Sequence, residues 1–305
     1  MNLENVKKIN KLGIELLGFS TVSNESWYAS SALRVVQLSL FMFFPIPASL
    51  PVASPRRSKN KKGEPCTLLV NHRRLQTCKV SKKLAVLGAT GQTGQCVVQQ
   101  ALQHGHVVVA IVRNPQKMKI SHSNLKVVKV NIFSSEELVS HLEGQDAIIS
   151  CLGFSISFLS PVTGYLDSMK AIVDTMQKVG VTRLVTMTSW YTNGEASPQC
   201  PWTIRWVLLP MIKSVLLNMQ EMEHFLTNDC GDINYTIVRP PGLVNGSCTD
   251  KEFRTTLNAF SVTLPDNCDI GLSGFHVSRA DVARFMLNVL STDKWDKKAV
   301  AIALI

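Results

Sequence analysis

Residues 84–102 read Leu-Ala-Val-Leu-Gly-Ala-Thr-Gly-Gln-Thr-Gly-Gln-Cys-Val-Val-Gln-Gln-Ala-Leu. An apolar run leads into three glycines, Gly88, Gly91 and Gly94, and a helix-like stretch follows them. A strand that enters a helix through a glycine-rich turn lets the backbone approach a pyrophosphate and points free helix N–H groups at it. Three glycines in seven residues also suit an ordinary loop. A second apolar run at 107–112 supplies the next strand of a βαβ unit, so we predict a nucleotide site.

The chain beyond residue 81 alternates regularly between strand-like and helix-like segments. Because helices of 10–15 residues separate the strands, this pattern is typical of parallel strands joined by crossovers. We therefore predict an α/β fold with a doubly wound parallel sheet, a Rossmann fold, in one domain over residues 81–305. The predicted strands are 83–87, 107–112, 126–130, 146–151, 182–188 and 234–239, and the predicted helices are near 93–104, 135–142, 163–179, 212–228 and 279–291.

The net charge of +10 is concentrated in the N-terminal extension, residues 1–80. Those residues hold 12 Lys and Arg against 4 Asp and Glu, which leaves 20 against 18 for the remainder. The folded part therefore gives no electrostatic indication of DNA or RNA binding, and we expect no nucleic-acid partner.

The extension contains an apolar stretch over residues 35–53, followed by a basic cluster at 56–62. Its length nearly suits a membrane span, but three prolines interrupt its second half. It begins too late for a secretory signal, and three early glutamates are unusual in a transit peptide. We expect a disordered extension on a cytoplasmic protein, with membrane contact restricted to 35–53. A membrane or organelle address is the alternative.

The eight cysteines form no C-x-x-C pair and no cluster with the spacing of metal ligands. Cys96 and Cys151 lie in apolar segments, where a buried free thiol is the ordinary state of cysteine. We therefore predict neither a metal site nor a disulfide framework.

The end of the second predicted strand indicates which dinucleotide the site prefers. NAD enzymes place a carboxylate there to hold the ribose 2′-hydroxyl, whereas this strand ends in Val112-Arg113. A guanidinium can pair with a 2′-phosphate that a carboxylate would repel. We therefore expect NADPH as the cofactor. A solvated surface arginine is the alternative reading of Arg113.

In such sheets, ligands also bind at the carboxyl ends of the later strands. Gly153 would let the backbone approach a ribose or nicotinamide, and the hydroxyl of Ser189 could hold the cofactor or donate to a carbonyl. Ser189 could equally be a cap or turn residue. Pro240 and Pro241 cannot extend a strand ladder, so we expect the chain to turn over the nicotinamide end there.

No Tyr-x-x-x-Lys sequence occurs in the chain. A tyrosine acid with a neighbouring lysine is therefore missing, and alcohol–ketone chemistry loses its usual proton donor. Hydride delivery to an acceptor that takes its proton from water remains possible.

Several stretches together resemble the atypical short-chain dehydrogenase/reductases, and within them the NADPH-dependent flavin reductase and biliverdin IXβ reductase group. The resemblance spans about residues 82–295 and leaves the extension without a counterpart. The matching stretches are Ala85–Gly94, Val112-Arg113, Gly144–Ile148, Leu152-Gly153, Leu159–Thr163, Thr188-Ser189, Val238–Pro241 and Ser278–Asp281.

The resemblance implies roles for individual residues. Arg113 and Lys117 would face the 2′-phosphate, and Ser189, the candidate catalytic residue, would lie beside nicotinamide and substrate. The pyrophosphate would be held by Thr90, Gly91, Gln92 and Thr93, with further cofactor contacts at Gly88, Gly94, Asn131, Leu152, Gly153, Thr188, Pro240 and Pro241.

Three departures from the family pattern stand out. Val130-Asn131 replaces the usual Gly-Asp, which keeps a hydrogen-bonding side chain near adenine but removes its charge. Gly242 stands where the biliverdin-reducing relative carries a histidine over the substrate, so tetrapyrrole activity is less securely implied than cofactor binding. The segment 195–217 is also longer and more aromatic than expected.

These observations predict a monomeric NADPH-dependent oxidoreductase that transfers hydride to a planar acceptor, such as a flavin, a tetrapyrrole like biliverdin, or a quinone. Catalysis would depend mainly on proximity and orientation. One alternative is an NmrA-like sensor or scaffold that binds NADP without turnover. Another is an NADP-dependent epimerase or isoflavone-reductase-like enzyme, which would need a base near the nicotinamide.

Overall fold

The structure is a computed structural model that describes residues 81–156, 160–263 and 275–304. All of these residues belong to one compact unit of the chain. The predicted extension 1–80, with its apolar stretch 35–53, lies outside the described residues, as does Leu159 at the start of one matching stretch.

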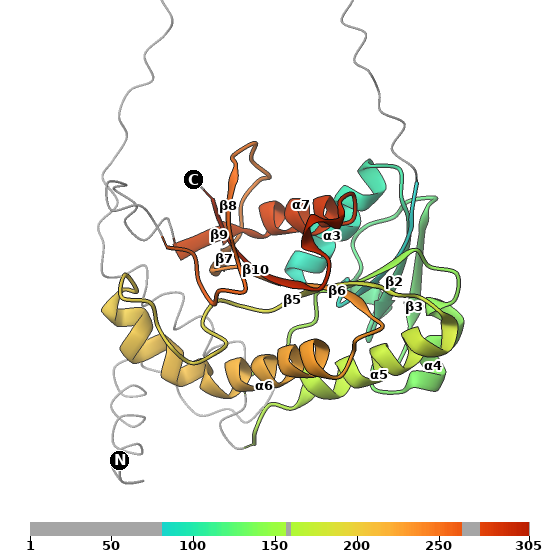
Figure 1. Cartoon of the computed structure of the whole chain (residues 1–305). Helices are drawn as coiled ribbons and strands as arrows, with labels where there is room; N and C mark the ends of the chain where they lie inside the picture. Colours follow the sequence, from blue (N-terminus) through green and yellow to red (C-terminus); the bar gives the residue numbers. More distant parts are fainter. Residues whose placement is uncertain (1–80, 157–159, 264–274, 305) are drawn as a thin grey trace, which may run out of the picture. The chain divides into compact units, whose positions relative to one another are not determined.

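An eight-stranded sheet forms the centre of the unit, in the order β3-β2-β1-β4-β5-β6-β10-β8 (Figure 1). All neighbouring strands are parallel except β8, which runs antiparallel to β10. The order reverses between β1 and β4, and ligands of open α/β sheets bind at such a switch point. The strands are β1 (Lys83–Leu87), β2 (Val107–Val112), β3 (Leu125–Lys129), β4 (Ala147–Ser150), β5 (Arg183–Met187), β6 (Asn234–Arg239), β8 (Phe253–Leu257) and β10 (Lys298–Leu304).

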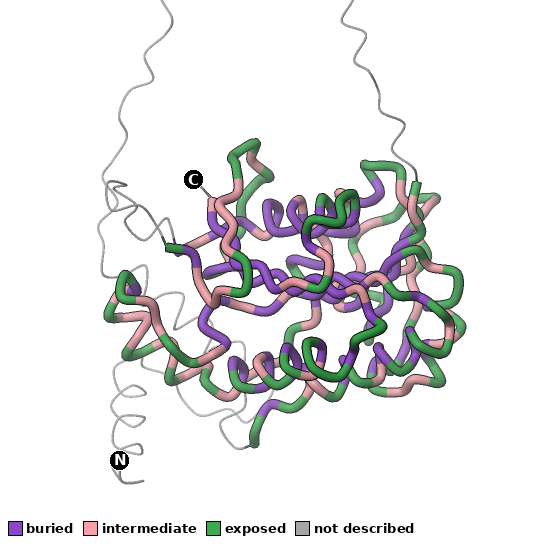
Figure 2. The backbone as a smooth tube through the Cα atoms, in the orientation of Figure 1, coloured by how far each residue is buried: buried purple, intermediate pink, exposed green. Residues whose placement is uncertain are grey.

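Helices cover both faces of this sheet (Figure 1). The first layer consists of α3 (Gln92–Gln103) and α7 (Arg279–Val289), which pack side by side. The second layer contains α4 (Ser135–Leu142), α5 (Gly164–Val179) and α6 (Leu209–Asn228). A separate hydrophobic core lies between the sheet and each layer, and the central strands are buried along most of their length (Figure 2).

The doubly wound fold is confirmed, and all six predicted strands and five predicted helices form close to the expected positions. The sheet is nevertheless mixed, because β8 and β10 extend it beyond β6 with one antiparallel pair. Sequence reasoning missed both strands. It also missed a small parallel pair formed by β7 (Gly242–Val244) and β9 (His276–Ser278).

The long aromatic segment 195–217 forms the irregular approach to α6 and its first turns. A π-helix, Ile204–Leu208, runs directly into α6. Trp202 and Trp206 are 70% and 72% exposed, so these rings lie at the surface. Within the three described ranges, no helix combines the length and the apolar character that crossing a membrane would require.

Candidate cofactor site

The glycine turn between β1 and α3 brings backbone segments close together. Gly88 has a φ of 71°, and a Cβ added there would lie 2.6 Å from the carbonyl oxygen of Cys151 at the end of β4. A Cβ on Gly94 would collide with the carbonyl oxygen of Gly88. The amide of Gly91 donates to that same oxygen over 2.9 Å. Glycine is therefore required for the turn to pack against the sheet and the helix.

The N-terminus of α3 is free to receive an anion. Its N-cap residue is Gly91, so no side chain caps the helix, and its first turn contains no acidic residue. The first N–H groups of a helix have no intrahelical acceptor and carry the positive end of the helix dipole. A phosphate at this position would satisfy them.

A pocket of about 380 Å³ opens beside this turn, at the carboxyl ends of β1, β2, β4 and β5. Most of the predicted cofactor residues contribute to its wall: Gly88, Thr90, Gly91, Gln92, Thr93, Arg113, Lys117, Leu152 and Gly153. Apolar side chains of Ile111, Val112, Ile132, Phe154 and Met187 complete much of the remainder. The topology thus gathers residues that are more than 90 positions apart in the chain.

The charged side chains among the described residues of this lining are all cationic: Arg113, Lys117 and Arg279. Arg113 follows β2, and Lys117 closes a short 3-10 turn that Asn114 caps by accepting from the amide of Gln116. Among the residues that the structure describes, no aspartate or glutamate belongs to the lining. The pocket therefore suits a ligand with several negative charges, which a dinucleotide phosphate carries.

Two groups in or next to the described pocket wall that could donate a proton, Cys151 and Tyr165, have pKa values too high for a general acid at neutral pH. Burial raises the pKa of the Cys151 thiol in the pocket wall to about 12, so the thiol stays protonated at neutral pH. Burial likewise raises the pKa of Tyr165, whose hydroxyl accepts from the amide of the pocket residue Phe154 over 3.3 Å. The wall can position a ligand but offers no obvious general acid.

The family comparison bears directly on this pocket. Residues 88–293 match the model of a family described as NAD(P)H-binding. The chain belongs to that NAD(P)H-binding family. The matched region begins at the first glycine of the turn and includes both layers of helices.

Two curated relatives of this NAD(P)H-binding chain are chloroplastic proteins of Arabidopsis thaliana. An uncharacterized protein is 33% identical over 172 residues, covering 54% of this chain and 60% of that protein. Protein TIC 62 is 27% identical over 202 residues, covering 59% of this chain and 30% of its own. The matches thus span 30% to 60% of these relatives' lengths.

Solved structures show the same fold at low sequence identity. The oxidoreductase ylbE of Lactococcus lactis has a TM-score of 0.57 and 19% identity, covering 73% of this chain and 91% of its own. A candidate NADH-flavin reductase of Streptococcus pneumoniae has a TM-score of 0.53 and 20% identity, covering 74% of this chain and all of its own. At this identity the comparison establishes the Rossmann-like fold and nothing finer.

Ser189 does not belong to the pocket wall, but it lies two residues beyond Met187, which does. It is half-buried, and its hydroxyl has no hydrogen-bond partner within the described ranges. The backbone next to Ser189 is held at the end of β6, because the amide of Trp190 donates to the carbonyl of Pro240, directly after that strand, over 2.9 Å. Ser189 is therefore available to a ligand that extends past the end of β5, and its catalytic role stays a prediction.

Other predicted contacts also lie outside the pocket wall. The Asn131 side chain accepts from the amide of Phe133, and Gly94 packs beneath the glycine turn. Pro240 and Pro241 are buried beside residues 188–192, the Ser189 segment, which follows β5. The hydroxyl of Thr188 is engaged elsewhere, because it donates to Glu223 over 2.7 Å.

Two groups near the site escaped sequence reasoning. Glu223 on α6 accepts from Thr188, Thr192 and Arg239 in a buried network directly behind the Ser189 segment. Arg279 enters the pocket wall from α7. Arg279 lies within Ser278–Asp281, one of the stretches that match the resembled family, but nothing in that stretch indicates that it contacts a ligand.

Proposed function

We propose that the protein is an NADPH-dependent reductase that transfers hydride to a planar acceptor. The observation that carries this proposal is the pocket at the switch point of the sheet. It joins a glycine turn, an uncapped helix N-terminus and three cations to apolar side chains that include Phe154 and Met187. Membership of the NAD(P)H-binding family supports the dinucleotide.

The preference for NADPH over NADH rests on Arg113 and Lys117. Both side chains are exposed at the end of β2 and both contribute to the pocket wall, whose described residues include no carboxylate. Guanidinium and ammonium groups bind a 2′-phosphate well, whereas a carboxylate there would select the 2′-hydroxyl of NADH. This end of the pocket therefore favours the phosphorylated cofactor.

When bound, NADPH supplies a hydride, which is two electrons and one proton, and water supplies the second proton that a reduced acceptor needs. The protein's own residues would position the reactants. Phe154 and Met187 offer apolar surface for a flat ring, while Ser189 could orient the cofactor or acceptor. Proximity and orientation alone can supply a large share of a rate enhancement, so a strong general acid is unnecessary.

The acceptor class is tested by an absorbance assay of NADPH consumption with FMN, biliverdin and a soluble quinone. We expect steady, enzyme-dependent NADPH oxidation with at least one of them. Flavin is the first candidate, because a protein with the same fold is a candidate NADH-flavin reductase. Absence of turnover with every planar acceptor would contradict the proposal.

A sensor or scaffold that binds NADP without turnover is the second candidate function. The lack of an obvious proton donor in the pocket wall fits it as well as it fits a reductase. Tight NADP binding without consumption of NADPH would favour it. The epimerase alternative requires a base near the nicotinamide, whereas Lys117, the lysine among the described residues of the pocket wall, follows β2 together with Arg113, where we place the 2′-phosphate.

We propose an organelle address for residues 1–80 rather than the cytoplasmic location expected from the sequence. Two curated relatives are chloroplastic proteins, which supports this choice. The test is the location in plant cells of a fluorescent protein fused to residues 1–80, compared with one fused to residues 81–305. Plastid fluorescence from the first fusion alone is expected, and diffuse cytoplasmic fluorescence from both would contradict the proposal.

A further inference from the structure

We propose that Arg279 binds the pyrophosphate of the dinucleotide and forms, with the N-terminus of α3, a phosphate subsite separate from Arg113 and Lys117. The inference rests on the cofactor site of the proposed function but not on turnover. Arg279 belongs to the pocket wall, whereas the neighbouring arginine on the same helix, Arg284, does not.

The topology brings Arg279 to the correct edge of the sheet. Helix α7 leads into β10, which lies parallel to β6, so the helix runs opposite to the strands and begins at their carboxyl edge. Helix α3 follows β1 and begins at that same edge. Because α3 and α7 pack together, Arg279 approaches the pocket from the side of α3. Arg113 instead enters at the end of β2.

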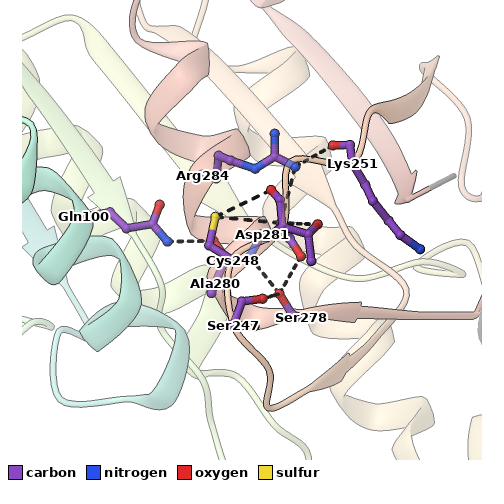
Figure 3. A network of polar contacts seen from close by, with 9 residues as sticks. Gln100, Ser247, Cys248, Lys251, Ser278, Ala280, Asp281 and Arg284 are labelled. Carbon is purple, nitrogen blue, oxygen red and sulfur yellow. Dashed lines mark hydrogen bonds and ion pairs between the residues drawn. The ribbon is translucent and has the colours of Figure 1, made fainter. Parts of the chain in front are cut away.

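The start of α7 is firmly attached to its surroundings (Figure 3). The Ser278 hydroxyl accepts from the amide of Asp281 over 2.9 Å and donates to its carboxylate over 2.7 Å. That buried carboxylate also accepts from the amide and hydroxyl of Thr249, at 2.9 and 3.0 Å. Gln100 of α3 donates to the carbonyl of Ala280 over 2.8 Å. A side chain carried by so constrained a helix end is suited to precise ligand positioning.

The guanidinium of Arg279 has unused binding capacity. It donates to the side-chain oxygen of Asn245 over 2.9 Å, and it makes no ion pair with a carboxylate in the described ranges. Arg279 is half-buried. Burial lowers the pKa of the Arg279 guanidinium, and a negative charge on the Cys96 thiol group would raise it. The guanidinium nevertheless stays protonated at neutral pH. A partly desolvated cation with free N–H donors gains from an anionic ligand.

A purely structural role explains this arrangement poorly. Asn245 is exposed, so one hydrogen bond to it would contribute little and would not require a guanidinium in the pocket wall. The N-terminus of α3 also contributes Gly91, Gln92 and Thr93 to the pocket wall, and no side chain caps it, so a phosphate can bind there. A pyrophosphate there would be held by backbone N–H groups on one side and Arg279 on the other.

The test uses isothermal titration calorimetry on the full chain with NADP⁺, NAD⁺ and ADP-ribose, and a competition measurement with adenosine 2′-monophosphate. All but the last contain the pyrophosphate. Arg279→Gln should weaken NADP⁺, NAD⁺ and ADP-ribose by the same factor, about ten- to a hundredfold, and leave 2′-monophosphate binding unchanged. Arg113→Ala should show the opposite pattern and weaken the two ligands that carry a 2′-phosphate.

Arg284→Gln is the matched control, because Arg284 lies on the same helix, donates to the carbonyl of Lys251 and pairs with Asp281, but does not line the pocket. It should bind all four ligands like the wild type. The inference is overturned if Arg279→Gln binds ADP-ribose normally, if its loss is confined to NADP⁺, or if Arg284→Gln shows the same loss. Normal binding of the wild type without any turnover would contradict the reductase function but support this subsite, provided that the Arg279→Gln pattern holds.

Discussion

Glu223 and Arg239 form a bidentate ion pair inside the protein. Nε of Arg239 lies 3.0 Å from Oε1 of Glu223, and Nη2 of Arg239 lies 2.7 Å from Oε2 of Glu223. Their side chains are 3% and 6% exposed. Arg239 also donates to the carbonyl of Ala259 and lies over the ring of Phe260. The same carboxylate accepts from Thr188 and thereby ties α6 to the segment that carries Ser189.

Glu223→Gln should therefore destabilise the protein strongly. The substitution leaves the guanidinium of Arg239 buried without its counter-charge, which typically costs about 3–5 kcal/mol. Urea unfolding measures the change in the free energy of unfolding. Asp174→Asn is the control, because its ion pair with Lys178 is half exposed and should be worth less than about 1 kcal/mol. Equal effects of the two substitutions would contradict the importance of the buried pair.

Arg113→Ala should change cofactor preference. Loss of a charge-assisted contact to the 2′-phosphate costs about 1.5–3 kcal/mol, so NADPH binding should weaken by about ten- to a hundredfold. NADH lacks that phosphate and should bind almost as before. Fluorescence titration with both cofactors measures the two dissociation constants, and equal losses would refute the assignment of Arg113.

Ser189→Ala should lower kcat by about tenfold if Ser189 orients the reactants. Removal of an essential general acid would cost more, about 10²–10⁴-fold. The substitution should leave NADPH binding and the unfolding midpoint close to the wild-type values, because the Ser189 hydroxyl has no partner within the described residues. A loss beyond a thousandfold in a folded variant would show that Ser189 transfers a proton.

The network around Asp281 should make stability depend on acid pH. Burial raises the pKa of this carboxyl, but hydrogen bonds from Ser278 and Thr249 and the charge of Arg284 together lower it below its usual value. A depressed pKa stabilises the fold above the unfolded pKa of about 3.9, and the gain disappears as pH falls through the folded-state pKa.

Asp281→Asn should thus cost about 1–3 kcal/mol at pH 7, and the difference from wild type should shrink below about pH 4. Urea unfolding at pH 7, 5, 4 and 3 follows this difference. Ser291→Ala, near the end of the same helical segment, is an exposed control that should be neutral at each pH. A difference in the free energy of unfolding between wild type and Asp281→Asn that stays constant down to pH 3 would contradict this role of Asp281.

A chain of residues 81–305 should be soluble and fully active. The matched family region begins at residue 88, and the pocket wall begins at Gly88. The comparison is the kcat and KM for NADPH in the full and shortened chains. An insoluble or inactive shortened chain would show that the apolar stretch 35–53 contributes to the folded domain.

The sequence alone predicts the parallel half of the fold well, because hydrophobic periodicity and the glycine turn are local signals. β2 and β6 form at the predicted bounds. The small pair β7–β9 and the antiparallel strand β8 depend on partners that are distant in the sequence, and they have short or polar strands. Their pairing energy comes from tertiary contacts, which a local pattern does not contain.

The same contrast between local signals and contacts of distant residues applies to the candidate cofactor site. The positions of the glycine turn and of Arg113 in the pocket wall could be predicted, because both follow from their place in a βαβ unit, while their roles in binding stay predictions. Glu223 pairs with Arg239 across the boundary between α6 and β6, and Arg279 approaches the pocket only because α7 returns beside α3. Nothing in the immediate neighbours of these residues distinguishes them from an ordinary helix glutamate or a residue after an N-cap.

The central claim is best tested by following NADPH labelled with deuterium at the transferred position of the nicotinamide, without oxygen, in the presence of the best acceptor from the panel. The account predicts one NADPH oxidised per acceptor reduced by two electrons, with deuterium leaving the cofactor and a slower rate than for unlabelled NADPH. Tight NADP⁺ binding together with no enzyme-dependent loss of absorbance at the nicotinamide band would contradict it.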